Sequence, residues 1–329
     1  MGTFNGHALP GSFFILYGLW SIWHILEKFY QRKLYELNKS NKQFPKFINR
    51  ISNPIIIKHS NVINNQYCSL QIIPIDSIFK LICSFIGIIL EKYPYFIDGS
   101  NFIFTTHSTQ HISMYAWFTF SSLLEICICY KVLKLPLESE YLFTSMALLS
   151  ELFLFLFHLH GRNSLDVYLH LLLTSMIILS ILISIVELLH PHEPIYGLMR
   201  SWTYLMQGTW FWQVGAILYP KTSWMPIWDQ AAKQSIPAAA NLFAYHMLGN
   251  FVVIILMIIL VIMYTKVGFM NTETMRTRLS SKMIRKQHIH SRIEQEQHQK
   301  FTIDNDVDEI EMWNYHCNTN SINDVVKKC

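Results

Sequence analysis

The residues with the clearest capacity for chemistry lie in the stretch ELFLFLFHLHGRNSLDVYLH, which runs from Glu151 to His170. Glu151 and His158 are seven residues apart, so a helix would place them on one face, two turns from each other. Asp166 and His170 are four apart, and a carboxylate at that spacing can fix the tautomer of an imidazole, as carboxylates do beside metal ligands. The stretch therefore combines a candidate general base with candidate metal or proton ligands.

Histidines from separate helices are predicted to reach the same depth of the protein, near the non-cytoplasmic ends of the predicted helices. The candidates for metal ligands are His7, His111, His158, His160, His170 and His246. The candidates for acid–base catalysis are Glu91, Glu151 and Asp166. Imidazoles and carboxylates at one depth suit a zinc site with an open position for water, a proton relay or a pH sensor. They equally suit hydrogen bonds between helices, which require no reaction.

A second notable segment is QGTWFWQ, at residues 207–213. Trp210 lies deeper in its predicted helix than the aromatic belt at a membrane surface requires. Trp210, Trp212 and Gln213 are therefore expected to pack against neighbouring helices or to line a lipid or ligand pocket.

Ionisable residues inside apolar segments are the usual candidates for function, because one at a helix centre costs roughly 2.5–3.5 kcal/mol to insert. Asp76 and Lys80 are four apart on one helix face, where they can form a structural ion pair or where the basic side chain can extend to the cytoplasmic surface. Glu125 and Glu187 lie near the ends of their predicted helices and are expected to face solvent. Glu151 differs from them because it lies near the middle of its helix.

The composition indicates what kind of protein must position these residues. The chain has 329 residues, a formal charge of +4, 51% hydrophobic residues and only 15% charged residues. Charged residues make up about a quarter of an ordinary soluble domain, so a water-soluble globule is excluded. The long apolar runs match a hydrocarbon thickness of about 30 Å. We therefore expect an integral membrane protein whose main partner is the lipid bilayer, with no nucleic-acid partner.

The apolar runs predict an all-α fold, a polytopic bundle of seven transmembrane helices within residues 1–267. The predicted helices cover about residues 8–27, 74–91, 107–130, 141–160, 165–189, 197–219 and 241–265. Residues 28–71 are polar and are expected to form a loop. Residues 268–329 lack a long apolar run and are expected to form a disordered tail.

Lysine and arginine concentrate on one side of these helices, in the 28–71 loop and at the start of the 268–329 tail. Because basic loops stay in the cytoplasm, the N-terminus is predicted to be luminal or extracellular and the C-terminus cytoplasmic. The basic residues between Lys28 and Lys58 are expected to bind anionic lipid of the cytoplasmic leaflet. The tail is the expected contact for cytoplasmic proteins.

Several motifs resemble the transmembrane protein 45 family, over about residues 1–26 and 75–250. They are GHALPGSFF at residues 6–14, QH-x-S-M-Y at 110–115, H-x-H-x-R-x-x-L-D at 158–166, QGTWFWQ at 207–213 and the pair Trp228–Asp229. The family usually has another histidine two residues before the one that matches His170, and this chain has Tyr168 there. The resemblance implies a seven-span protein of secretory or endosomal membranes, with proposed roles in trafficking and cell-surface physiology.

Two main classes of function arise as hypotheses, and we favour the first. The chain would be a non-enzymatic trafficking or adaptor protein of the secretory pathway, the endosomes or the plasma membrane. Alternatively it would be a zinc-dependent lipid hydrolase, with Asp166 orienting an imidazole and Glu151 or Glu91 as general base. The zinc ligands would then be His111, His158, His170 and His246. A proton-linked transporter or a receptor is a third alternative, because seven spans indicate a topology and not a function.

Overall fold

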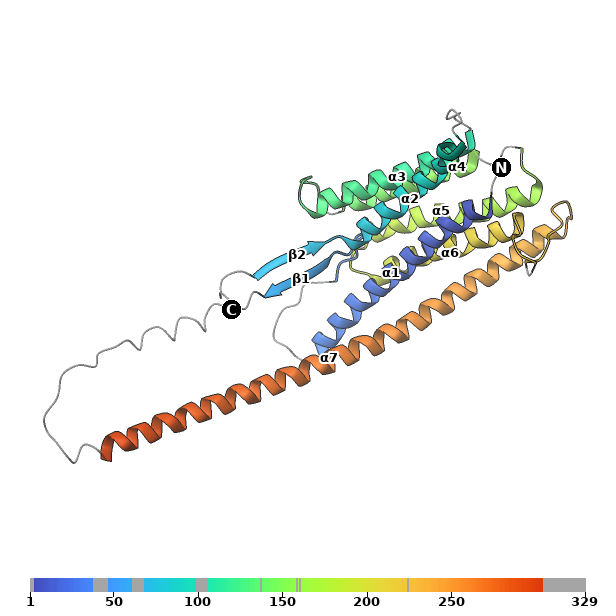
Figure 1. Cartoon of the computed structure of the whole chain (residues 1–329). Coiled ribbons are helices and arrows are strands. Elements are labelled where there is room, and N and C mark those ends of the chain that lie inside the picture. Colours follow the sequence, from blue (N-terminus) through green and yellow to red (C-terminus); the bar gives the residue numbers. More distant parts are fainter. Residues whose placement is uncertain are drawn as a thin grey trace. The chain divides into compact units, whose positions relative to one another are not determined.

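The computed structural model describes residues 3–37, 47–60, 68–98, 106–136, 138–157, 159, 161–223 and 225–303. The chain divides into two compact units, Met1–Phe269 and Met270–Cys329. The elements in chain order are α1 (Phe4–Leu37), β1 (Ile55–Ser60), β2 (Cys68–Ile73), α2 (Ile75–Asp98), α3 (Thr106–Cys129), α4 (Ser139–Phe157), α5 (Ser164–Leu189), α6 (Pro194–Leu218) and α7 (Ser235–Ile303). The helices of the first unit run side by side as a bundle (Figure 1).

Helices α1 and α6 form a close pair because small residues face each other along their contact. Ser201, Gly208 and Gly215 recur every seven residues along α6. A Cβ atom on Gly208 would lie 2.7 Å from the backbone oxygen of Gly11 in α1, and one on Gly11 would lie 2.8 Å from the backbone oxygen of Gly208. Further along the pair, Ser201 donates a hydrogen bond of 2.7 Å to Ser21. The motifs GHALPGSFF and QGTWFWQ therefore contact each other, which was not predicted from the sequence.

The core lies where α6 meets α1, α5 and α7. One cluster of buried side chains joins Leu169 of α5 to Trp210 of α6 and Phe243 of α7. A second cluster joins Ile22 of α1 to Leu205 of α6. The remaining helices complete a ring, in which α1 contacts α2, α2 contacts α3, α3 contacts α4 and α4 contacts α5. This ring positions the candidate site residues.

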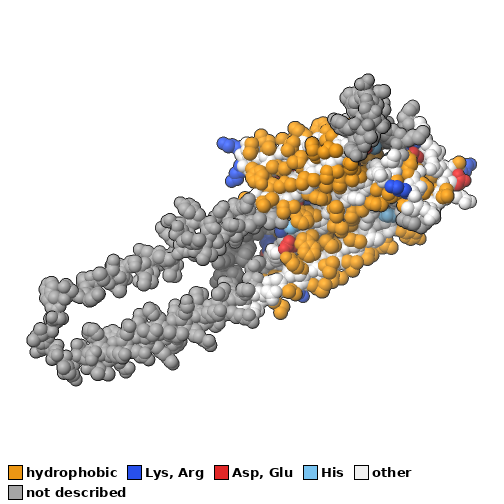
Figure 2. Space-filling view, viewed as in Figure 1, with side chains coloured by type: hydrophobic (Ala, Val, Ile, Leu, Met, Phe, Trp, Pro, Cys, Tyr) orange, Lys and Arg blue, Asp and Glu red, His pale blue; other side chains and the backbone are white. Residues whose placement is uncertain are grey.

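Hydrophobic side chains cover the outside of the bundle, as a lipid environment requires. Figure 2 shows them over most of the visible face, with charged side chains toward the ends of the helices. Within the described residues, five segments are long and apolar enough to cross a membrane: Phe4–Leu34, Thr109–Cys129, Ser139–Phe157, Ser164–Leu189 and Ser235–Asn271. The chain thus has the character of an integral membrane protein. The full count of seven spans, with α2 and α6 included, stays a prediction, as does the orientation of the termini.

The polar segment after the first apolar run is more ordered than the sequence predicted. Helix α1 ends at Leu37 rather than near residue 27, because polar pairs four residues apart support the extra turns. Gln31 donates to Glu27 at 3.0 Å, and Arg32 donates to Glu36 at 2.7 Å. Strands β1 and β2 then form an antiparallel pair inside the expected 28–71 loop. The fold is a helical bundle, as predicted, and it carries one small two-stranded sheet that was not predicted.

The last helix also differs from the prediction. It runs from Ser235 to Ile303, whereas the sequence predicts a helix end near residue 265 and disorder from residue 268. Residues 269–303 contain neither proline nor glycine and many Lys, Arg, Glu and Gln residues, which are favourable in helices. The prediction of a disordered tail is therefore corrected for residues 268–303, and its remainder, residues 304–329, lies outside the described residues.

The other helices start close to the predicted positions. Helices α3, α4, α5 and α6 begin and end within about three residues of the predicted bounds. Differences of this order are expected because helix ends fray. Helix α2 continues to Asp98, beyond the predicted end at residue 91.

Candidate functional site

We call the two ends of the bundle the inner end and the outer end. The inner end is where α1 ends and α2 begins, and it is the end that the sequence predicts to face the cytoplasm. Between the ends, a cleft opens among α1, α2 and α3, with α4 and α6 contributing to its floor. It holds about 630 Å³ of space not filled by atoms, part of which is open to the surroundings.

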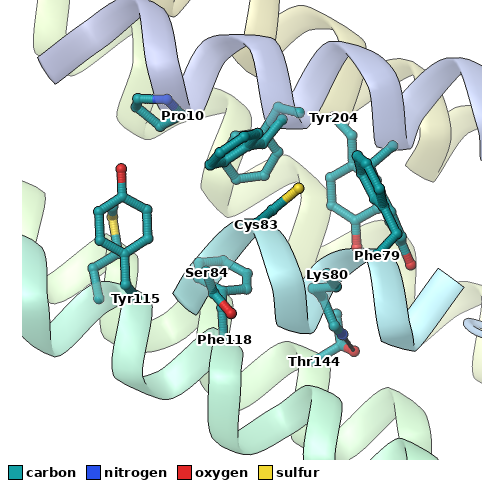
Figure 3. Close-up of a pocket in the computed structure, with 13 residues that line it drawn as sticks. Pro10, Phe79, Lys80, Cys83, Ser84, Tyr115, Phe118, Thr144 and Tyr204 are labelled. Carbon is teal, nitrogen blue, oxygen red and sulfur yellow. Dashed lines mark hydrogen bonds between the residues drawn. The ribbon is translucent and has the colours of Figure 1, made fainter. Parts of the chain in front are cut away.

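The walls of the cleft are apolar and largely aromatic. Phe14 comes from α1, Phe79 from α2 and Phe118 from α3, and Tyr204 of α6 lies at the floor. Figure 3 shows the thiol of Cys83 pointing from α2 toward α1 across this space. Most pockets that take small molecules have this character, with apolar walls and few polar groups.

The polar end of the cleft carries a neutralised charge. Among the described residues that line the cleft, Lys80 is the only charged one. Its Nζ atom lies 2.5 Å from Oε1 of Glu125 and 3.4 Å from the hydroxyl oxygens of Ser121 and Thr144. Glu125 also accepts a hydrogen bond of 2.9 Å from Ser77. The ammonium group is therefore paired, and this end of the cleft has polar groups without a net charge.

Lys80 does not pair with Asp76, although their spacing on α2 allows it. Asp76 accepts a hydrogen bond from the indole of Trp20 and another, of 2.6 Å, from the backbone N–H of Asn53. Glu125 was expected to face solvent but is only 1% exposed. A buried carboxylate requires a compensating partner, and α2 supplies Lys80 for this purpose.

Residues 47–53, which we call the inner segment, lie at the inner end of the bundle, and most of their side chains are buried. The sequence predicted part of a solvated basic loop here, yet Ser52 has no exposed surface. Its backbone N–H and hydroxyl both donate to Glu140 of α4, which also pairs with Arg50 at 3.0 Å. Tyr17, a lining residue of the cleft, donates to a carbonyl of the inner segment at 3.5 Å. The inner segment therefore contacts the wall of the cleft.

Two basic residues that were predicted to bind anionic lipid are thus engaged within the protein. Arg50 pairs with Glu140, and Lys28 donates a hydrogen bond to Asn53. Lys33 is exposed, and for it and the other basic residues of the loop the contact with anionic lipid stays a prediction.

A second buried ion pair lies beside the inner segment. Arg200 of α6 and Glu187 of α5 have no exposed surface, and Nε of Arg200 lies 2.6 Å from Oε2 of Glu187. Arg200 also donates to the carbonyl of Arg50 at 3.3 Å. Glu187 was expected at a solvated helix end, but the packing of α6 and the inner segment excludes solvent from it. Its charge is instead balanced by Arg200.

At the outer end, several of the predicted site residues meet. Nδ1 of His170 lies 2.8 Å from Oδ1 of Asp166, as their spacing on α5 predicts. Arg162 donates to both carboxylate oxygens of Asp166, at 2.9 and 2.8 Å, an arrangement that was not predicted from the sequence. The ring of His7 lies 5.7 Å from the ring of His170. Helices α1 and α5 thus bring two imidazoles and one carboxylate together.

Two further candidates pair with each other nearby. Nδ1 of His111 in α3 lies 2.7 Å from Oε1 of Glu91 in α2. His7 lies within electrostatic range of both His111 and His170. His158 and His160 lie outside the described residues, and the convergence of the histidines on one functional site stays a prediction.

His246 does not join this group. Its Nε2 lies 3.3 Å from Oε1 of Gln213, and its ring packs edge-on against Trp210, with 5.5 Å between ring centroids. Trp210 donates to a backbone carbonyl of α5 at 3.0 Å, and Trp212 donates to Ser12 at 3.1 Å. Both tryptophans therefore pack against neighbouring helices, which is one of their two predicted roles. Neither of them lines the cleft, so the other role, lining a pocket, is not seen there.

A zinc site is not assembled by the part of the chain that the structure describes. Among those residues, no three His, Cys, Asp or Glu side chains are placed so that they could hold one metal ion. The candidate base Glu151 lies in the middle of α4 and has no exposed surface. The candidate ligands are therefore divided between separate places, and His158 and His160 fall outside the described residues.

The cleft itself was not predicted from the sequence. Its signals were present as Pro10 and Phe14 in the GHALPGSFF motif and as Lys80 inside an apolar run. None of these signals indicates which helices are neighbours, and that arrangement creates the cleft.

One comparison with known proteins bears on this region. A model described as a family of unknown function (DUF716) matches residues 137–265. Over these residues the chain is similar to that family. The match covers α4, α5, α6 and the apolar part of α7, so it includes Glu151, Asp166, His170, Gln207 and His246.

Proposed function

We propose that the chain is a non-enzymatic, multi-pass membrane protein that binds a neutral amphipathic lipid in the cleft among α1, α2 and α3. The observation that carries this proposal is the cleft, which combines aromatic walls with one polar end. An acyl chain would lie against Phe14, Phe79 and Phe118. The polar head would lie near Lys80, where hydrogen-bonding groups gather.

The head group is expected to be uncharged. Lys80 already pairs with Glu125, so a further anion would leave a net negative charge in the bundle. A cation would be repelled by the Lys80 ammonium at close range. The hydroxyl groups of Thr144 and Ser84, which also line the cleft, already donate to Glu125 and to the Leu81 carbonyl, so their oxygens can accept a hydrogen bond from a neutral alcohol. A long-chain alcohol or a diglyceride has this chemistry.

A non-enzymatic role is supported by the pairing of two of the three candidate catalytic groups, Asp166 and Glu91. Asp166 is held by Arg162 and His170, and Glu91 is held by His111. A general base must lie within about 2.6–3.2 Å of the proton that it removes. None of these side chains lines the cleft, so none is placed to act on a lipid bound there.

A trafficking or adaptor role in secretory, endosomal or plasma membranes is part of the same proposal. It is supported by the resemblance to the transmembrane protein 45 family, whose members fall within the family of unknown function that matches residues 137–265. Helix α7 also continues past its apolar part, which ends at Asn271, as far as Ile303. Such an extension offers a surface for cytoplasmic proteins.

Native mass spectrometry tests the lipid-binding proposal. The protein released from its micelles is expected to retain one lipid per chain. Cys83→Trp should reduce the lipid-bound fraction at least tenfold, because Cys83 is 7% exposed and the indole would fill the cleft. Ile82→Trp, at a neighbouring residue that is 52% exposed on the outside, should leave that fraction unchanged. Equal lipid retention by folded wild-type and Cys83→Trp proteins would refute the proposal.

A further inference from the structure

Two fully buried polar side chains in the middle of the bundle have no hydrogen-bond partner in the described residues. Both carboxyl oxygens of Glu151 in α4 are buried and unpartnered, and so are both polar atoms of the Gln207 carboxamide in α6. Buried polar groups are almost always hydrogen-bonded, so each such group requires an explanation. Four unpartnered polar atoms on two helices indicate one shared binding site.

The packing on either side places the two residues at one level. Helices α4 and α6 both run from the inner to the outer end. Toward the inner end, Leu148 of α4 packs in one cluster with Tyr204 of α6. Toward the outer end, Phe155 of α4 contacts Phe211 of α6, with 5.7 Å between ring centroids. Glu151 is three residues after Leu148, and Gln207 is three residues after Tyr204, so the two side chains occupy matching positions.

The surroundings of this level are apolar. On the α1 side, the ring of Phe14 stacks on Phe211 at 6.0 Å and packs against Tyr204 at 6.2 Å. On the α5 side, Ile177 packs with Leu148 and Tyr204. Glu151 has no exposed surface, and a bare carboxylate in such an environment is strongly disfavoured.

The titratable and charged groups nearest this carboxyl group do not compensate it. From α3, Tyr115 lies within electrostatic range. From α5, His170 packs against Phe155 and is engaged by Asp166. From α6, Arg200 lies two turns inward of Gln207 and is engaged by Glu187. No charged side chain in the described residues pairs with Glu151, in contrast to Glu125, Glu140 and Glu187.

We propose that Glu151 and Gln207 form a proton-binding site within the membrane, with Glu151 as the residue that carries the proton. The two side chains form no hydrogen bond with each other in the structure. A change of side-chain rotamer would let the protonated carboxyl group donate from one oxygen to Oε1 of Gln207 and let Nε2 of Gln207 donate to the other carboxyl oxygen, which would satisfy all four atoms at once. A sodium ion is the less suitable ligand, because the two side chains offer three oxygen atoms and hard cations take six or more.

The proposed site and the cleft share two neighbouring side chains. Phe14 and Tyr204 line the cleft and also flank the level of Glu151 and Gln207. Loss of the proton would leave a charge behind these two rings and would require water or a shift of helices to stabilise it. Occupancy of the cleft and protonation of Glu151 are therefore coupled through the same two side chains.

Infrared spectroscopy of the full chain in lipid tests the proton directly. Wild-type protein should show a carbonyl band of a protonated carboxyl group that shifts in D2O, and Glu151→Gln should lose that band. The amide keeps the shape and stays neutral, so the variant should melt at or above the wild-type temperature. Glu36→Gln, at an exposed residue, should leave the band unchanged. A band that survives in Glu151→Gln would overturn the proposal, as would sodium-dependent melting of the wild type that is absent from Glu151→Gln.

A double-mutant cycle tests whether the two residues share one site. Glu151→Leu and Gln207→Leu should each lower the melting temperature, because each leaves the other side chain buried without a partner. The double variant should melt higher than the sum of the two single shifts predicts. Additive shifts would show that Gln207 does not hold the carboxyl group and would contradict the proposed site. If Glu151→Leu does not fold, the infrared comparison still decides the question.

Discussion

Replacing Arg200 by methionine is expected to lower the free energy of unfolding by about 3–5 kcal/mol. The guanidinium group and the Glu187 carboxylate are both fully buried and lie 2.6 Å apart. Removal of one partner leaves a buried charge without compensation, and this penalty is larger than the net contribution of the intact pair. Arg200 also donates to the carbonyl of Arg50, so the inner segment would lose a contact at the same time. Equilibrium unfolding in mixed micelles measures the effect.

Two controls separate this effect from a general cost of removing arginine. Arg32→Met breaks a pair in which the partner, Glu36, is 54% exposed, and it should change the free energy by less than about 1 kcal/mol. The double variant Glu187→Leu with Arg200→Met removes both charges and should recover most of the loss, because apolar residues can replace a buried pair. A double variant as unstable as Arg200→Met alone would show that the charge pairing is not the cause.

Replacing Gly208 by leucine is the second change with a large expected effect. A Cβ atom alone would lie 2.7 Å from backbone atoms of α1, which cannot move away independently as the tip of a side chain can. Overpacking of a dense contact typically costs about 1–3 kcal/mol, and the three further carbons of leucine place this change at or above the upper end. That cost exceeds the roughly 0.8–1.0 kcal/mol by which a helix interior favours alanine, the best helix former, over glycine. The free energy of unfolding should fall accordingly.

The matched control is Gly249 in α7, where an added Cβ atom would meet nothing within 4 Å. Gly249→Leu should be neutral or slightly stabilising, since it gains helix propensity without a clash. Similar unfolding free energies for Gly208→Leu and Gly249→Leu would mean that α1 and α6 are not in close contact, and the arrangement of the bundle would have to be revised.

The sequence predicted the apolar helices well, because hydrophobic runs are a local signal. It did not predict the end of α1, because Gln31 and Arg32 look like loop residues until their partners one turn away are considered. The 69-residue length of α7 was missed for a related reason, since a polar segment without proline or glycine is compatible with both helix and disorder.

The candidate site was only partly predictable. The spacing of Asp166 and His170 placed the carboxylate beside the imidazole, because four residues make one helical turn. The partner of Lys80 could not be found in this way, because Glu125 is 45 residues away on another helix. The cleft depends on which helices are neighbours, and a single sequence carries no direct record of that. The burial of Arg50 was missed because its partner Glu140 is also distant in the sequence.

Photo-crosslinking tests the central claim, the binding of a neutral lipid in the cleft, most directly. The probe is a long-chain alcohol that carries a diazirine in its chain, added to membranes that contain the full chain and then illuminated. We expect adducts on the lining residues Cys83 and Phe118 themselves, loss of the Phe118 adduct in Cys83→Trp, and its persistence in Ile82→Trp. Adducts confined to outward-facing residues such as Ile82 and Phe85, with the same yield in Cys83→Trp, would contradict the claim.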